Sequence, residues 1–209
     1  MRRIVAWCLV LLLASCSSTR FVDSWKNNEV TVFSPKKLLV IGITDNLTAR
    51  KIFEEELRLA FIRKGINAFE STEIIDESFS DTKRSEEEIQ EMTDEIIEQG
   101  FDAVAITAIK GVDDKVDYRS DYYDIRYSWY RFGRYWYLYQ DVYHTPGYYS
   151  QYKVYHVETA VYDLLGEENH ALVWVGSFDI MDPTSITITV DDYVERIIKQ
   201  MERDGLLLK

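Results

Sequence analysis

Two short, largely apolar runs restrict the folds open to this chain more than any other feature. They are KLLVIGIT at residues 37–44 and FDAVAITAI at residues 101–109. A strand with one face in water alternates apolar and polar residues, whereas a strand covered on both faces is apolar along most of its length. We therefore predict two buried strands with structure packed on both faces of their sheet.

The segments between these runs have the periodicity of helices. Residues 48–64 carry an apolar stripe, and Gly65 follows where a left-handed residue commonly ends a helix. The Ser-Glu-Glu-Glu sequence at 85–88 is a capping box that opens a second helix, which ends before Gly100. A short strand is predicted at 66–70. The apolar stripe of the first helix consists of Phe53, Leu57, Ala60 and Phe61.

The last part of the chain has a different order. Residues 154–165 and 171–180 are typical of two long strands, joined by a Gly-Glu-Glu-Asn turn at 166–169. A final helix follows and ends at Gly205. Its apolar face consists of Val190, Val194, Ile197, Ile198 and Met201. The order β-α-β-α-β, hairpin, α predicts one α/β domain over 36–209, with a mixed sheet of about five strands and helices packed against it.

The amino terminus has the pattern of a lipoprotein signal. Met1, Arg2 and Arg3 precede the apolar run 4–13, which is shorter than the ~20 helical residues that a membrane span requires. The sequence Leu-Ala-Ser-Cys at 13–16 then resembles the bacterial lipobox, whose cysteine thiol takes up a diacylglycerol. We predict a signal peptide over 1–15 and lipidation of Cys16; an ordinary secreted protein cleaved nearby is the alternative.

The residues after Cys16 suggest where the lipoprotein would reside. Position 17 is Ser rather than Asp, which in the common two-membrane sorting scheme resembles outer-membrane cargo. No acidic cluster follows to suggest surface export, so we expect the periplasmic face of the outer membrane. We predict that residues 16–35 form a polar tether that can add an edge strand to the sheet. Its apolar residues are Phe21, Val22, Trp25, Val30, Val32 and Phe33.

The charge of the mature chain limits its partners. Loss of Arg2 and Arg3 with the leader leaves 22 of the 24 basic side chains against 36 acidic ones, a formal charge of −14. Such a surface repels nucleic-acid phosphates and anionic head groups. We predict no nucleic-acid partner, and membrane attachment through the lipid alone. Cys8 is lost with the leader, so an internal disulfide is excluded.

Several short motifs of the mature chain resemble a family of small bacterial envelope lipoproteins. They are Ser24-Trp25-Lys26, the KLLVIGIT strand, Arg50 with Phe53-Glu54, and Leu172-Val173-Trp174. At fold level the element order also resembles the α/β domain shared by the curli-secretion lipoprotein CsgG, the amino-terminal domain of TolB and lipoprotein activators of cell-wall synthases. The resemblance implies a partner-binding module on the periplasmic side, and it transfers no catalytic residue.

A Tyr/Trp-rich insertion at 118–155 separates the third strand from the hairpin. A connection of this length is unusual unless it is functional or disordered. Aromatic rings beside arginines suit protein interfaces and sugar stacking. A twisted hairpin whose aromatics cover each other and the sheet, or a low-complexity loop, is the alternative. The candidate contact residues are Tyr127, Trp129, Tyr130, Arg131, Arg134, Tyr135, Trp136 and Tyr137.

Motifs that would indicate catalysis are missing from the sequence. It has no Gly-x-Gly pair and no Gly-x-Ser-x-Gly elbow, and its histidines (His144, His156, His170) lack zinc-site spacing. An acidic cluster at 113–124 lacks the order of an EF-hand, which leaves only weak calcium binding as an alternative. We predict a non-catalytic protein without a cofactor.

We therefore expect a lipid-anchored protein-binding or envelope-assembly module. Its contact surfaces would be the sheet edge and the aromatic insertion. The alternative is a carbohydrate- or peptidoglycan-binding lipoprotein that uses Trp129 and Trp136 as stacking platforms.

Overall fold

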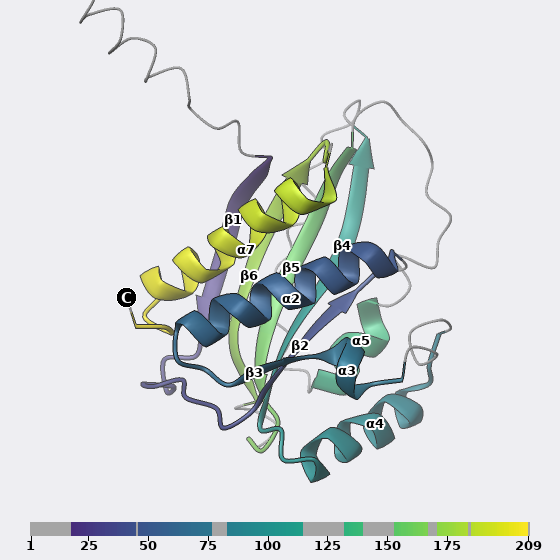
Figure 1. Ribbon diagram of the computed structural model, residues 1–209, viewed down its shortest axis with the longest axis vertical. Helices are drawn as coiled ribbons and strands as arrows, with labels where there is room; N and C mark the ends of the chain where they lie inside the picture. Colours follow the sequence, from purple (N-terminus) through teal and green to yellow (C-terminus); the bar gives the residue numbers. More distant parts are fainter. Residues whose placement is uncertain are drawn as a thin grey trace, which may run out of the picture.

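A computed structural model describes residues 18–44, 46–76, 83–114, 132–139, 153–166, 171–183 and 185–208. Its centre is a six-stranded sheet with the strand order β1-β6-β5-β4-β2-β3 (Figure 1). The short strand β2 is parallel to both β3 and β4, and the remaining pairs are antiparallel. The strands are β1 (Thr19–Lys26), β2 (Leu38–Ile43), β3 (Ala68–Glu70), β4 (Ala103–Asp114), β5 (Lys153–Asp163) and β6 (Leu172–Met181).

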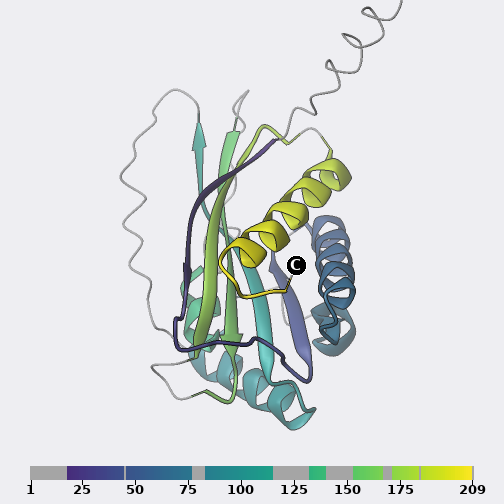
Figure 2. The same ribbon diagram turned by 90° about the vertical axis from the view of Figure 1, so that its left-hand side faces the viewer.

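Helices cover both faces of the sheet, as the apolar runs predict. Helices α2 and α7 lie on one face, and α4 and α5 lie over the lower part of the other (Figure 2). The mixed α/β fold is therefore confirmed. The helices are α2 (Leu47–Arg63), the single turn α3 (Ser71–Ile74), α4 (Glu86–Glu98), α5 (Phe132–Tyr139) and α7 (Ile186–Arg203). None of these described helices is long and apolar enough to cross a membrane.

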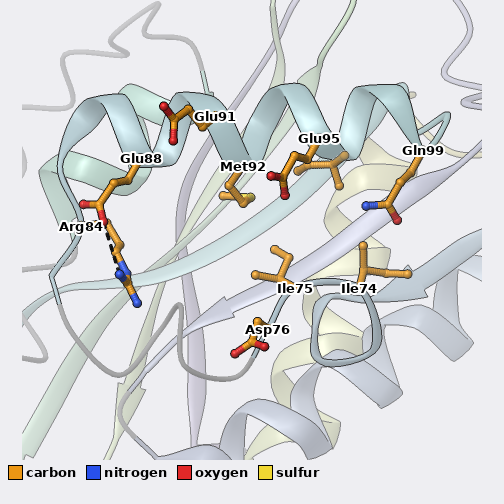
Figure 3. Close-up of a pocket in the computed structure, with 10 residues that line it drawn as sticks. Ile74, Ile75, Asp76, Arg84, Glu88, Glu91, Met92, Glu95 and Gln99 are labelled. Atoms are coloured by element: carbon orange, nitrogen blue, oxygen red, sulfur yellow. Dashed lines mark hydrogen bonds and ion pairs between the residues drawn. The ribbon is translucent and has the colours of Figure 1, made fainter.

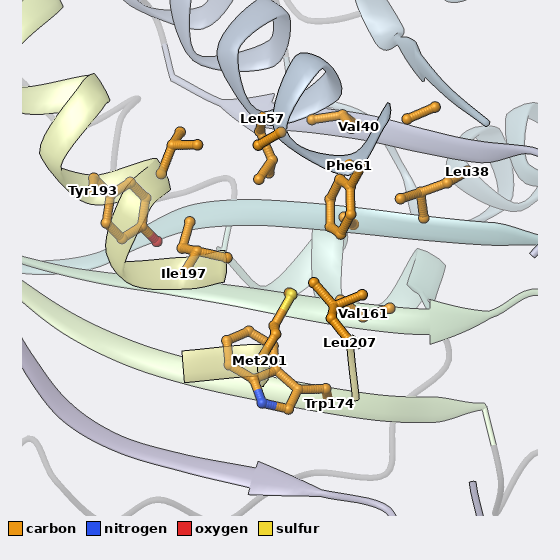
Figure 4. Close-up of a cluster of buried hydrophobic side chains, with 14 of the residues drawn as sticks. Leu38, Val40, Leu57, Phe61, Val161, Trp174, Tyr193, Ile197, Met201 and Leu207 are labelled. Carbon is orange, nitrogen blue, oxygen red and sulfur yellow. The ribbon is translucent and has the colours of Figure 1, made fainter. Parts of the chain in front are cut away.

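The larger core lies between the sheet and the α2–α7 layer. Leu57 and Phe61 of α2 and Ile197 of α7 point toward the strands, where Trp174 and Val161 meet them (Figure 4). The indole of Trp174 is fully buried, and its Nε1 donates to Asp204 Oδ2 at 2.8 Å. A second core between the sheet and α4–α5 contains Ile89, Ile96, Val104, Ile106 and Tyr162.

The predicted helix ends are confirmed. Glu88 N–H donates to Ser85 Oγ at 3.2 Å, and Ser85 N–H donates to Glu88 Oε2 at 2.8 Å, so the capping box is complete. Gly65, Gly100 and Gly205 have φ values of 80°, 87° and 72°. This left-handed conformation is strained for other residues, so glycine is favoured just past each of these helices.

The segment at 16–35 was predicted as a tether that can add an edge strand, and the structure has this strand near its start. β1 pairs with β6 from Thr19, opposite Ile180, to Lys26, opposite Trp174. Residues 30–33 form no strand. The sheet therefore has six strands rather than about five, and the edge strand begins three positions after Cys16.

Several elements begin or end together at one end of the sheet, which we call the upper end. β1 begins there at Thr19, β4 ends at Asp114, β5 begins at Lys153 and β6 ends at Met181 (Figures 1 and 2). Met181 N–H donates to the carbonyl of Ser18 at 2.8 Å. Helix α7 also starts at this end, and the backbone N–H of Thr19 donates to the α7 carboxylate of Asp192 at 2.9 Å.

Candidate functional site

Half of the predicted contact surface lies outside the described residues. This applies to Tyr127, Trp129, Tyr130 and Arg131, and also to the predicted lipidation site Cys16. Arg134 and Tyr135 belong to helix α5, but their side chains are outside the description as well. Trp136 and Tyr137 are therefore the two candidate contact residues whose side chains can be placed.

The described part of the aromatic insertion is a helix docked on α4. Phe132 and Trp136 are 2% and 3% exposed, and their rings meet edge to face at 6.0 Å between centroids. Gly133 lies against α4, since a Cβ atom on it would be 3.4 Å from Ile89 Cγ2, about van der Waals contact. Tyr137 directly follows Trp136 on α5 and is 39% exposed.

This arrangement differs from both structural alternatives suggested by the sequence. Residues 132–139 form neither a strand of a twisted hairpin nor a loop. Packing of insertion aromatics against the core is nevertheless confirmed for Phe132 and Trp136. Because Trp136 is buried, it anchors α5 and is not accessible as a sugar-stacking platform in this structure.

The insertion begins and ends at the upper end of the sheet. The chain leaves it after Asp114, passes through α5 beside α4 in the lower half of the molecule, and returns to it at Lys153 (Figure 1). Asp114 and Lys153 are themselves paired across β4 and β5. The two roots of the insertion therefore lie side by side on neighbouring strands of the sheet.

A charged cluster crosses the sheet just below these roots. Arg20, Asp179 and His156 lie in one row on the neighbouring strands β1, β6 and β5. Arg20 Nη2 donates to Asp179 Oδ2 at 2.8 Å, and His156 Nδ1 lies 2.8 Å from Asp179 Oδ1. His156 Nε2 lies 3.2 Å from Asp113 Oδ2 on β4. The side chain of Asp179 is 4% exposed and that of His156 is 12% exposed.

The two carboxylates favour the charged form of His156. Its hydrogen bond to Asp179 raises the pKa of the imidazole above the ordinary 6.5; burial opposes this shift, and Asp113 adds to it. A protonated ring can donate from both nitrogens, whereas a neutral ring can donate from only one. His156 therefore links strands β4, β5 and β6, and both of its nitrogens are engaged. It is not arranged as a general base.

This arrangement predicts a pH-dependent contribution to stability. Because the folded pKa is raised, the stabilisation by His156 is complete below about pH 6.5 and is lost as pH rises through the folded pKa. His156→Gln is expected to lower the free energy of unfolding by about 1–3 kcal/mol at pH 5.5 and by clearly less at pH 9. Urea unfolding of both proteins at each pH measures this difference. An equal loss of unfolding free energy at pH 5.5 and pH 9 would contradict the role of His156 as a donor from both ring nitrogens.

A second buried polar cluster lies where the parallel strands β2 and β3 end, a common place for ligand sites in α/β sheets. Glu54 is fully buried, and its Oε1 accepts from Gly42 N–H at 2.9 Å, Arg50 Nε at 3.0 Å and Ser71 Oγ at 2.6 Å. Its Oε2 accepts from Thr72 N–H at 3.0 Å. Arg50 is 2% exposed and also donates to Ser71 Oγ at 2.8 Å. With donors on both oxygens, the carboxylate joins β2, α2 and α3 and serves a structural role.

A surface hollow of about 260 Å³ lies between α3 and α4 (Figure 3). Ile75 and Met92 point into it, and carboxylates of α4 border it. One of these, Glu88, belongs to the capping box, and the hydrogen bonds from Ser85 lower its pKa. The described lining contains no histidine or cysteine. Residues 77–82, which join α3 to α4, lie outside the described residues. The described parts of the chain contain no group of three or more His, Cys, Asp or Glu side chains that could hold a metal ion.

Both sheet edges carry features that oppose the addition of a further strand. The register of β1 shifts between Phe21 and Asp23, and its side chains include the charged Arg20, Asp23 and Lys26. The opposite edge, β3, has only three residues. Bulges, charges and short strands are the usual protections of sheet edges. The edges are therefore weaker candidates for a partner surface than the aromatic insertion.

Comparisons of sequence and structure with known proteins gave only weak similarities. The sequence matches no protein-family model and no curated protein. In structure the chain is similar to two PelC dodecamers from Paraburkholderia phytofirmans, one of them a point variant. Their TM-scores are 0.40 and 0.39, each at 10% identity, covering 86% and 90% of this chain and 95% and 98% of the PelC chains. Lipoprotein GNA1162 from Neisseria meningitidis gives a TM-score of 0.39 at 14% identity, covering 81% of this chain and 99% of its own. Likeness at this level transfers neither a partner nor a function.

Proposed function

We propose that this chain is a lipid-anchored lipoprotein of the periplasmic face of the outer membrane, and that it acts as a non-catalytic protein-binding or assembly module. The observation that carries the proposal is the short connection between the lipobox and the fold. Only Ser17 and Ser18 separate Cys16 from the first residue of β1. Lipid on Cys16 would hold the sheet itself, and with it both roots of the aromatic insertion, close to the membrane.

The aromatic insertion supplies the proposed contact surface. Phe132 and Trp136 fix α5 on the core, and Tyr137 faces outward beside them. Tyrosine, tryptophan and arginine dominate the energetics of protein interfaces, because they bury a large area and still form hydrogen bonds. The proposed partner surface consists of Tyr127, Trp129, Tyr130, Arg131, Arg134, Tyr135 and Tyr137, with Trp136 as its support.

The chemistry of the described clusters supports a non-catalytic role. His156 has carboxylates at both ring nitrogens, and buried Glu54 accepts hydrogen bonds at both oxygens. A catalytic acid or base requires a side chain that can reach a bound substrate. Each of these polar clusters instead joins neighbouring strands and helices, which is a structural role.

Site-specific photocrosslinking in intact envelopes tests the proposed surface. A photoreactive phenylalanine derivative replaces Tyr137 in one variant and Ile62 in a control, since both side chains are similarly exposed, at 39% and 44%. We expect a covalent adduct with an envelope protein at position 137 and none at position 62. Adducts only with peptidoglycan fragments would favour the glycan-binding alternative. Equal labelling at both positions would contradict a contact surface at the insertion.

A further inference from the structure

The first turn of α7 exposes two isoleucines. Ile186 and Ile188 are 38% and 68% exposed, whereas the following residues Thr189 and Val190 are buried. Ile188 lies off the buried face of the helix, at a position where amphipathic helices carry polar residues. Residues 183–190, PTSITITV, contain no charged side chain in a chain that is otherwise strongly acidic. This turn is therefore an uncharged, apolar projection of the surface.

The turn lies at the upper end of the sheet, beside the start of β1 (Figures 1 and 2). The two elements are joined directly, because Thr19 N–H donates to Asp192 Oδ2 at 2.9 Å, one helical turn after Ile188. Three peptide steps connect Cys16 to Thr19, and three residues span at most about 11 Å. A lipid on Cys16 therefore requires the bilayer surface to lie within this distance of Thr19 and close to the isoleucines.

We propose that Ile186 and Ile188 insert into the head-group region of the membrane beside the lipid of Cys16. This inference rests on the lipid anchor of the proposed function and adds an orientation: the upper end of the sheet faces the bilayer. Isoleucine side chains gain free energy on leaving water, and no basic cluster contributes to this turn, so the contact is apolar and insensitive to salt. A second copy of the chain is a less suitable partner for the two isoleucines, because the short anchor holds this turn against the membrane.

A fluorescent label at position 188 tests the contact. In the mature chain the thiol of Cys16 is blocked by its lipid, so Ile188→Cys provides a single reactive cysteine for an environment-sensitive dye. The acylated protein is reconstituted in vesicles of phosphatidylethanolamine and phosphatidylglycerol, some of them carrying a spin-labelled lipid. Ile62→Cys is the matched control, because Ile62 is 44% exposed near the end of α2, where Lys64 pairs with Glu202 of the last turn of α7.

We expect a blue-shifted emission at position 188 and quenching by the spin-labelled lipid at least about threefold stronger than at position 62, unchanged in 0.5 M salt, as for an apolar contact. Equally weak quenching at both positions, in protein that still floats with the vesicles, would overturn the contact and leave the lipid anchor standing. A blue shift at 188 without lipid quenching would assign the turn to a second copy and overturn the contact as well. Protein that carries no acyl mass and does not float would instead refute the proposed function.

Discussion

Replacing Glu54 with alanine is expected to lower the free energy of unfolding by about 3–5 kcal/mol, because it removes one member of the buried ion pair with Arg50. Glu54 is fully buried and accepts hydrogen bonds from Gly42, Arg50, Ser71 and Thr72. Natural domains are stable by only about 5–15 kcal/mol, so this loss would be a large part of the total. Urea unfolding of the variant and the parent measures it.

The neighbouring Glu55 provides a matched control, since it lies on the same helix but is exposed. Glu55→Ala is expected to change the free energy of unfolding by less than about 0.5 kcal/mol. The double variant Arg50→Met, Glu54→Leu removes both charges and is expected to be more stable than Glu54→Ala alone. A Glu54→Ala protein as stable as the Glu55→Ala protein would contradict the structural role of the buried cluster.

Much of the fold could be predicted because its signals are local. The capping residues Ser85 and Glu88 mark one helix start within four positions, and Gly65 and Gly100 mark two helix ends. The apolar run at 37–44 contains β2, whose six residues are all buried. Each of these signals depends on neighbours in sequence, so no knowledge of the tertiary structure was needed to interpret it.

The strand β1 was harder to place because its alternation is interrupted. The shift in register between Phe21 and Asp23 leaves Val22 as an extra residue. The apolar side chains of this strand therefore do not follow a regular alternation of apolar and polar positions. The segment therefore resembles an irregular tether. Its pairing with β6 is a contact between segments far apart in the sequence, and no local pattern in residues 16–35 predicts it.

Helix α5 was missed for a different reason. Tyrosine, tryptophan and phenylalanine favour strands when considered singly, and so the insertion suggested a hairpin. Phe132, Gly133 and Trp136 nevertheless have the spacing of one helical face, and this face is the one that packs on α4. This spacing was the available signal that Trp136 belongs to the core rather than to a ligand surface.

The charged cluster could have been found from the predicted hairpin. His156 lies ten residues before Gly166, and Asp179 lies ten residues after Asn169, so a symmetric turn at 166–169 places them opposite each other. The contribution of Arg20 could not be inferred in the same way, because it depends on the register of β1 against β6, which the sequence did not predict. Of the cluster, the contact between His156 and Asp179 could therefore have been predicted from the sequence.

Replacing Cys16 with alanine is expected to remove the protein from the membrane, because the variant has no thiol to carry the proposed lipid anchor. Burial of each CH₂ group of an acyl chain contributes only ~0.8 kcal/mol, and durable attachment therefore needs the several chains of a lipoprotein anchor. Without them, we expect partition into the detergent phase to fall by more than about 100-fold. Detergent phase separation followed by intact-mass analysis measures both the partition and the acyl mass.

Cys8→Ala is the matched control, since Cys8 is the other cysteine of the chain and lies within the predicted leader. This variant is expected to keep the acyl mass and the membrane association of the parent. A Cys16→Ala protein that has lost its leader and still enters the detergent phase would refute the lipid anchor. In that case the exposed turn at Ile186 and Ile188 would have to hold the protein alone, and two isoleucines bury too little area for this. We therefore expect stable attachment to require the proposed lipid, and the turn to contribute only the orientation of the sheet.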